Sequence, residues 1–161
     1  MNPLKNSWKL WFHDPKNNKW DIDSYMEICK ISSIENFWKL YHLLDSKKIH
    51  EGMYFFMKDD IPPLWENEEN INGGCWSYKI NKRDVYNAWI ELSIAVCINN
   101  LIKEELSKDI VTGISISPKN SFCVLKIWIN DTQFSDKSYI SKKIPNLFTS
   151  QCIFKSHKSR N

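Results

Sequence analysis

The chain is poor in glycine, and its four glycines are scattered. They stand at positions 52, 73, 74 and 113, so neither a G-x-G-x-x-G segment nor a P-loop can be written. Binding of a nucleotide through a glycine-rich phosphate cradle is therefore excluded. Any phosphate must be held by side chains.

Paired cysteines and long apolar runs are missing as well. The five cysteines form no C-x-x-C pair and the four histidines are scattered, so we expect neither a disulfide framework, nor a metal site, nor a bound cofactor. The sequence has no signal peptide and no apolar run long enough to cross a membrane. We expect a soluble, monomeric, cytoplasmic protein without a membrane partner.

Aromatic residues, in contrast, are abundant. They make up 14% of the chain and include eight tryptophans, more than one small core needs, so some of them should serve a surface. The length of 161 residues predicts a single domain over residues 1–161. The net charge of +3 permits an anionic ligand but is too small for a protein that coats nucleic acid.

The order of the expected elements indicates the fold class. A capping box at Ser32 and Glu35 predicts a helix to about Ser46, Asp84 can cap the longest helix, to about Ser107, and a polar helix is expected around 133–143. Strands in pairs with helices interspersed predict an antiparallel α+β domain. The strands are expected at 8–13, 21–31, 52–58, 76–80, 110–117, 121–130 and 151–155.

Both longer helices carry apolar side chains away from their core face. On the first, Ile34 and Trp38 are expected to lie to one side of the face that enters the core. On the second, a stripe that begins with Ile90 and Ile94 lies nearly opposite the stripe expected in the core. This second stripe can contact a neighbouring helix or a partner.

The segment Ile61-Pro-Pro-Leu-Trp-Glu-Asn67 places a tryptophan and a carboxylate side by side after two prolines. Because the prolines stiffen the loop, Trp65 has little entropy to lose when it stacks on a flat ring. Glu66 can accept hydrogen bonds from the paired donor edge of guanine. On this segment alone, a surface turn around a core tryptophan is the more frequent explanation.

Taken in order, the tryptophan phrases resemble the eukaryotic translation initiation factor 4E family, which binds the 5′ cap of messenger RNA. Each phrase is unspecific by itself, but their order along nearly the whole chain is very specific. The phrases are Trp8-x-x-Trp11-Phe12, Glu35-Asn36-Phe37-Trp38, Pro63-Leu64-Trp65-Glu66, Gly73-Gly74-x-Trp76, Ala88-Trp89-Ile90-Glu91, Ile127-Trp128 and Ser156-His157, with Trp20 between the first two.

The resemblance implies a cupped hand. A strongly curved antiparallel sheet of about eight strands would carry three helices on its convex face. The cap, 7-methylguanosine joined through a triphosphate, would bind in the concave face. A scaffold initiation factor would bind the helical back.

The resemblance also assigns the guanine site. Trp20 and Trp65 match the two tryptophans that sandwich the methylated ring, whose positive charge strengthens stacking on indole. Glu66 matches the carboxylate that accepts the N1 and N2 hydrogens, and Trp128 matches the residue that touches the N7-methyl group. The alternative for the tryptophans is core packing, and for Glu66 a solvated surface carboxylate.

The phosphate end departs from the family pattern. Lys119 stands where the family commonly has an arginine, and Val124 stands where it has a lysine. Lys126 should share a strand face with Trp128, so we expect it to substitute, although a solvated lysine is an equal alternative. Cys75 replaces a residue that is often basic. A less cationic phosphate site is expected.

On the back, the family binds a helix with a tyrosine, four residues and a leucine. Such helices belong to the scaffold factor of the 4G type and to competing repressors, and packing between helices of the monomer is the alternative. The matching positions are Pro3, Leu4, Ile34, Trp38, Ile90, Glu91 and Ile94.

Three functions compete at this point. The first is an initiation factor that binds capped mRNA and recruits a scaffold, and the second is a family-like repressor that binds the cap without productive recruitment. The third, an enzyme acting on caps, is disfavoured. Glu68 and Glu69 lie in a loop rather than on a metal-binding helix, no nucleophile–base arrangement is evident, and a glycine-rich cofactor loop is lacking.

Overall fold

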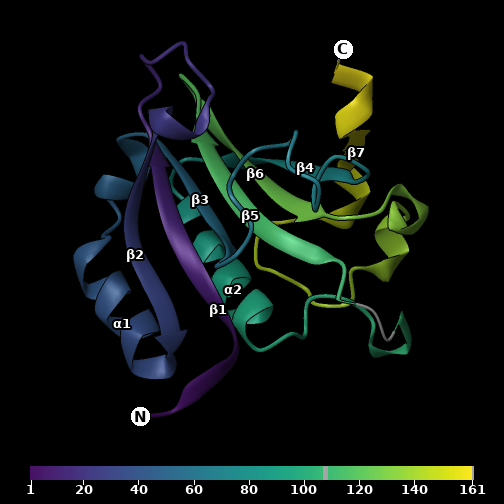
Figure 1. Cartoon of the computed structure of the whole chain (residues 1–161), viewed down its shortest axis with the longest axis horizontal. Helices are drawn as coiled ribbons and strands as arrows, with labels where there is room; N and C mark the ends of the chain where they lie inside the picture. Colours follow the sequence, from purple (N-terminus) through teal and green to yellow (C-terminus); the bar gives the residue numbers. More distant parts are fainter. Residues whose placement is uncertain (107–108, 161) are drawn as a thin grey trace.

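Seven antiparallel strands form one sheet in the computed structural model, which describes residues 1–106 and 109–160 (Figure 1). Their spatial order is β2-β1-β3-β5-β6-β4-β7, so strands from the two ends of the chain form the edges. The strands are β1 (Pro3–His13), β2 (Tyr25–Ser33), β3 (Met53–Lys58), β4 (Gly74–Asn81), β5 (Val111–Pro118), β6 (Phe122–Ile129) and β7 (Ile153–Ser156).

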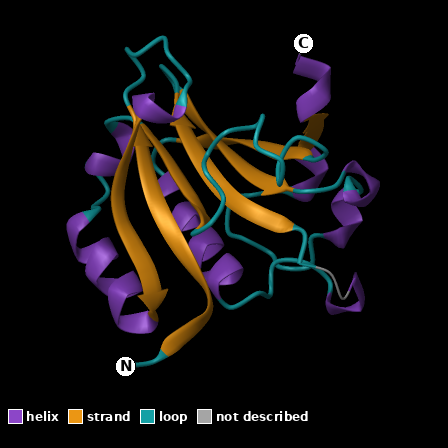
Figure 2. Cartoon of the chain, in the orientation of Figure 1, coloured by secondary structure: helices purple, strands orange, loops and turns teal. Residues whose placement is uncertain are grey.

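Two α-helices, α1 (Ile34–Leu43) and α2 (Val85–Cys97), lie on the same side of this sheet (Figure 2). The predicted α+β class and the curved antiparallel sheet with helices behind it are confirmed. The counts differ, because the described residues hold seven strands rather than about eight and two α-helices rather than three. Within the same residues, no helix has both the length and the apolar character needed to cross a membrane.

Strand alternation separates two apolar clusters, one on each face of the sheet. Trp8, Phe56 and Trp76 point to the helices and are buried in the larger cluster. The residues next to them along the strands, among them Phe55 and Cys75, point to the other face of the sheet. They belong to a smaller cluster on the concave face. The concave face therefore carries aromatic residues with their own packing support, which is unusual for the open side of a sheet.

Helix α1 begins one residue later than the predicted capping box. Ser33, not Ser32, caps the helix, and its Oγ accepts a hydrogen bond from the Asn36 amide at 3.1 Å. The shift arises because Ser33 still pairs with Pro3 as the last residue of β2. Glu35 instead accepts hydrogen bonds from the amide and side chain of Asn2, and backbone hydrogen bonds lower its pKa to about 2.

Helix α2 ends at Cys97, well before the predicted end at Ser107, which itself lies outside the described residues. Asn99 adopts a left-handed conformation with φ of 58°, and the Asn100 amide reaches back to the Ala95 carbonyl at 3.0 Å. This is a Schellman-type stop with asparagine in the place of glycine. The apolar pattern continued to Leu101 because the chain turns back into the core, where Leu101 is buried.

The helix expected around 133–143 is wrong. Instead, short 3-10 turns occupy Thr132–Phe134 and Lys137–Tyr139. The carboxylates of Asp131 and Asp136 accept hydrogen bonds from amides two residues ahead, at 2.9 Å each, and so close local turns that compete with helix propagation.

Candidate functional site

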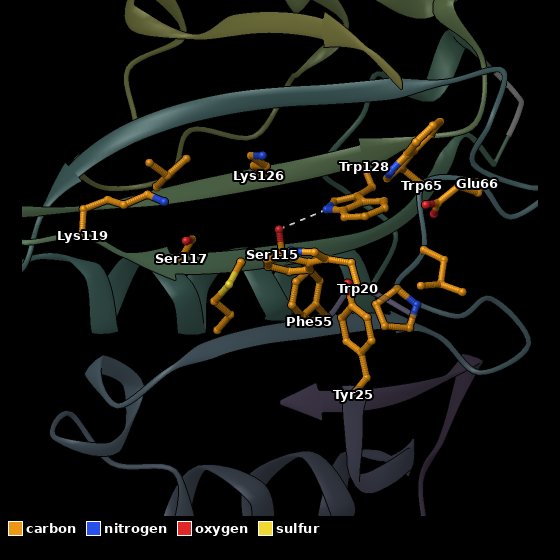
Figure 3. Close-up of a pocket in the computed structure, with 14 residues that line it drawn as sticks. Trp20, Tyr25, Phe55, Trp65, Glu66, Ser115, Ser117, Lys119, Lys126 and Trp128 are labelled. Carbon is orange, nitrogen blue, oxygen red and sulfur yellow. Dashed lines mark hydrogen bonds between the residues drawn. The ribbon is translucent and has the colours of Figure 1, made fainter. Parts of the chain in front are cut away.

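A cavity of about 400 Å³ opens on the concave face of the sheet (Figure 3). Its walls come from the loop after β1, the loop after β3, and the strands β5 and β6. The structure thereby brings together all six residues that the sequence assigned to the cap. The lining consists of Trp20, Tyr25, Met53, Phe55, Pro63, Leu64, Trp65, Glu66, Ser115, Ser117, Lys119, Val124, Lys126 and Trp128.

Trp20 enters the cavity from the loop between β1 and β2. Its indole is 48% exposed, yet it stacks in parallel on the buried ring of His13, with 4.0 Å between ring centroids and 3° between planes. The imidazole Nε2–H donates to the Lys19 carbonyl at 2.8 Å. One residue of the strand thus holds both the ring and the backbone of the loop that carries Trp20.

Trp65 lies on a loop that is fastened from within. The buried side chain of Asn70 donates from Nδ2 to the carbonyls of Leu64 at 2.9 Å and Pro62 at 3.4 Å. The hydroxyl of Thr112, on β5, donates to Asn70 Oδ1 at 2.8 Å. These bonds connect the segment before Trp65 to the centre of the sheet.

Trp128 forms the floor of the cavity between the two loops. It is 5% exposed, and its indole N–H donates to Ser115 Oγ on the neighbouring strand at 3.0 Å (Figure 3). The ring of Phe55 lies edge-on to it, with 6.1 Å between ring centroids, and the ring of Tyr25 lies edge-on to Phe55, with 5.3 Å between centroids. This aromatic chain fixes the floor in one orientation.

Glu66 is exposed at the rim beside Trp65. The pKa of the Tyr25 hydroxyl is raised mainly by burial and, to a smaller extent, by the negative charge of Glu66. The cavity therefore presents a carboxylate at one end of an otherwise aromatic surface.

The opposite end of the cavity is basic. Lys119 lies in the hairpin turn, which is closed by its amide donating to the Phe122 carbonyl at 2.8 Å. Lys126 and Val124 alternate with buried residues on β6 and line the same wall as Ser117 of β5. Figure 3 shows both lysines on the side of the cavity away from Glu66.

Cys75 does not line the cavity. It is fully buried beside Trp128, its cross-strand partner on β6, and its sulfur lies 3.9 Å from His157 Nε2. Its thiol consequently supports the floor instead of contacting a ligand.

On the helical face, an apolar groove of about 130 Å³ runs between the start of β1, α1 and the end of α2. Of the seven residues that the sequence assigned there, it contains Leu4, Ile34, Trp38 and Ile94. Pro3 and Glu91 are exposed outside it, and Ile90 packs against the core. Phe37, Cys97 and Ile98 complete the lining.

Several contributors to the cavity were missed from the sequence. Phe55 could have been found, because strand alternation puts it on the face opposite to Phe56. Ser115 could have been found in the same way. His13 and Asn70 had no recognisable pattern, since a histidine at a strand end and an asparagine in a polar turn are common.

The cavity has the chemistry of a binding site. The titratable residues that line it are Tyr25, Glu66, Lys119 and Lys126. Among the described residues, no cluster of three or more His, Cys, Asp or Glu side chains is arranged to hold a metal ion. An aromatic floor and walls, a carboxylate at one end and two ammonium groups at the other suit a flat base that carries phosphates.

Comparisons with known proteins agree with this arrangement. Residues 3–161 match the family model described as "Eukaryotic initiation factor 4E". The chain is 32% identical over 146 residues to the Xenopus laevis eukaryotic translation initiation factor 4E, covering 86% of this chain and 66% of that protein. The chain thus spans just under two thirds of the length of this relative.

A longer match comes from the Candida albicans factor of the same name. It is 30% identical over 173 residues, covering 99% of this chain and 81% of that protein. Among solved structures, the complex of C. elegans eIF4E-3 with the 4E-binding protein Mextli and cap analog superposes with a TM-score of 0.78, at 22% identity, covering 98% of this chain and 94% of that one. The chain belongs to the eukaryotic initiation factor 4E family.

Proposed function

We propose that residues 1–161 form a single cap-binding domain that holds the 7-methylguanosine cap of mRNA in the concave cavity. The observation that carries the proposal is the convergence of Trp20, Trp65, Glu66 and Trp128 on one cavity from distant parts of the chain. The family consists of translation initiation factors, which are not enzymes. The role proposed for this chain is accordingly recognition without chemistry.

In the proposed complex, the methylated guanine lies between Trp20 and Trp65 with Trp128 beside its N7-methyl group. Stacking contributes about 1–3 kcal/mol per base, and a cation over an indole adds ~0.5–2 kcal/mol. Because plain guanine lacks the positive charge, the second contribution distinguishes the methylated ring. Glu66 accepts the N1 and N2 hydrogens, a charge-assisted pair that adenine cannot offer.

The phosphates are proposed to contact Lys119 and Lys126. Val124 lines the wall between them and gives no charge, so the phosphate end relies on fewer cations than the family pattern. Affinity should therefore depend more on the guanine end than in relatives with a full basic set.

Tryptophan fluorescence tests the proposal directly. Titration with 7-methyl-GTP is expected to quench the emission in a saturable way, and plain GTP is expected to quench far less at the same concentrations. Equal quenching by the two nucleotides, or none by either, would contradict cap recognition.

The groove on the helical face is proposed to bind the tyrosine-x4-leucine helix of a scaffold factor or of a repressor. Exposed Trp38 and Ile34 flank an apolar groove, and an amphipathic helix can bury both. The solved structure of C. elegans eIF4E-3, a complex with the 4E-binding protein Mextli, supports a protein partner for this fold. Recruitment of the scaffold leads to translation initiation; binding without productive recruitment is the repressor alternative.

A pull-down with a scaffold peptide distinguishes the initiation role from the repressor alternative. The initiation role predicts capture by the wild-type chain and loss of capture by Trp38→Ala, with cap binding intact. If the wild-type chain captures no scaffold peptide and Trp38→Ala changes nothing, the repressor alternative replaces the initiation role.

A further inference from the structure

His13 is a buried titratable group that the proposed ligand contacts do not use. It is 0% exposed and stacks on Trp20 at 4.0 Å, but it is not among the residues that line the cavity. Its ring therefore covers the indole face turned away from the cavity. The other face of Trp20 is left for a ligand.

The hydrogen bonds of His13 define its neutral form. The Lys19 carbonyl can only accept, so Nε2 carries the proton of the 2.8 Å bond. The second ring nitrogen, Nδ1, is buried and has no hydrogen-bond partner among the described residues. Protonation would place a second N–H there without an acceptor, and it would add a positive charge directly behind Trp20.

We infer that His13 is a charge-sensitive positioning residue for Trp20. Its neutral ring supports the indole for stacking, and its protonation weakens the binding of a cationic base on the opposite face. The inference rests on the proposed function, because the base that stacks on Trp20 carries the positive charge of 7-methylguanine. Two positive charges would then lie on opposite faces of one indole and repel each other.

The groups packed around His13 come from β2, from the loop that carries Trp20 and from β3. Tyr25 from β2 lies 4.9 Å away, and its pKa is raised by burial. Lys19 and Trp20 come from the loop, and Met53 pairs with His13 from β3. The charge of Glu66 acts on Tyr25. Side chains of the lysine and tyrosine types titrate at higher pH than those of the histidine type, and side chains of the glutamate type titrate at lower pH.

The first test compares the pH dependence of cap binding in two proteins. The wild-type chain should lose about three- to tenfold of its affinity for 7-methyl-GTP as the pH is lowered from about 7 and His13 takes up a proton. His13→Phe keeps a ring against Trp20 without a titrating nitrogen, but it loses the bond to the Lys19 carbonyl. Each protein is therefore compared with its own affinity near pH 7, and the variant should show the flatter profile. Titration of the ligand is common to both proteins and cancels in the comparison. Parallel profiles would overturn the inference.

The second test needs no ligand and no change at His13. In ¹H–¹⁵N spectra of the free protein, the indole N–H of Trp20, assigned with Trp20→Phe, should shift with the same midpoint as the His13 imidazole. An indole resonance that stays fixed while His13 titrates would overturn the coupling. If 7-methyl-GTP does not bind near pH 7 at all, cap recognition fails as a function, and this spectrum still decides the role of His13.

Discussion

The two loops that reach into the cavity are held by different forces. The Trp20 loop is closed by bonds that face solvent, such as Lys16 and Lys19 amides donating to the side chains of Asp14 and Asn17 at 2.9 Å. The Trp65 loop is fastened by the buried Asn70 amide and its link to β5. Trp20 rests on the ring of His13, which also holds the backbone of its loop through one bond to the Lys19 carbonyl. Trp65 has no such ring behind it in the contacts described above, and the backbone before it is held by two bonds from Asn70.

The difference in bonding makes the Trp20 loop the more adaptable of the two and the Trp65 loop the more preorganised. Hydrogen bonds at the surface exchange readily with water, and buried ones are costly to break because the freed groups remain unsatisfied. We therefore expect the Trp65 side to be ready before the ligand arrives and the Trp20 side to adjust around it. Four substitutions test this view, in decreasing order of expected effect.

Glu66→Ala should cause the largest loss, about a hundredfold in affinity for 7-methyl-GTP. It removes two charge-assisted hydrogen bonds, worth about 1.5–3 kcal/mol each, from the preorganised side. The fold should be unaffected because Glu66 is exposed. Glu68→Ala, an exposed carboxylate nearby that does not line the cavity, is the matched control. Near-wild-type retention of Glu66→Ala on cap resin would remove Glu66 from guanine recognition.

Trp20→Ala should weaken binding of 7-methyl-GTP by about thirtyfold, through loss of one stacking face. The preference over plain GTP should fall with it, because the cation–π contribution is lost. Since the indole is half-exposed, the unfolding temperature should change little. Competition titrations with both nucleotides measure the preference, and an unchanged preference would place the discrimination elsewhere.

Asn70→Ala should lower both stability and affinity, the latter by about tenfold. It leaves the Leu64 carbonyl and the Thr112 hydroxyl without their buried partner, at about 1–3 kcal/mol for each unsatisfied group. Asn72→Ala, at an exposed position two residues away, is the control. Thermal unfolding and cap titration are measured together; a destabilised variant with normal affinity would show that the anchor does not preorganise Trp65.

Lys126→Ala should have the smallest effect, about a threefold loss for 7-methyl-GTP and almost none for 7-methylguanosine, as expected for one partly exposed charge pair. Lys39→Ala, on the helical back, controls for the change in net charge. Calorimetry with both ligands resolves the difference. Equal losses for the two ligands would show that Lys126 does not contact phosphate.

The sheet and its faces could be predicted because strand alternation is local. The strands expected at 76–80, 110–117 and 121–130 appear in the structure as Gly74–Asn81, Val111–Pro118 and Phe122–Ile129. The helix ends were harder, because the Asn99 turn and the aspartate-capped 3-10 turns depend on a few side-chain hydrogen bonds that compete with helix periodicity.

Within the site, residues that match an ordered set of tryptophans could be assigned before the fold was known. Asn70 and Cys75, which support them, could not. Asn70 is hydrogen-bonded to Thr112, which is 42 residues away in the chain. Cys75 lies beside Trp128 because β4 pairs with β6. Such contacts are set by strand pairing between distant segments, which no local pattern records.

Strand β6 has a consequence for how this protein can vary. Leu125 and Ile127 fill the core, whereas Val124, Lys126 and Trp128 face the ligand side between them. A substitution at an outward position leaves the buried neighbours untouched, so folding and ligand preference are encoded on alternate residues of one strand. Substitutions at these outward positions can therefore change the charge of this wall while the demands of the core stay the same.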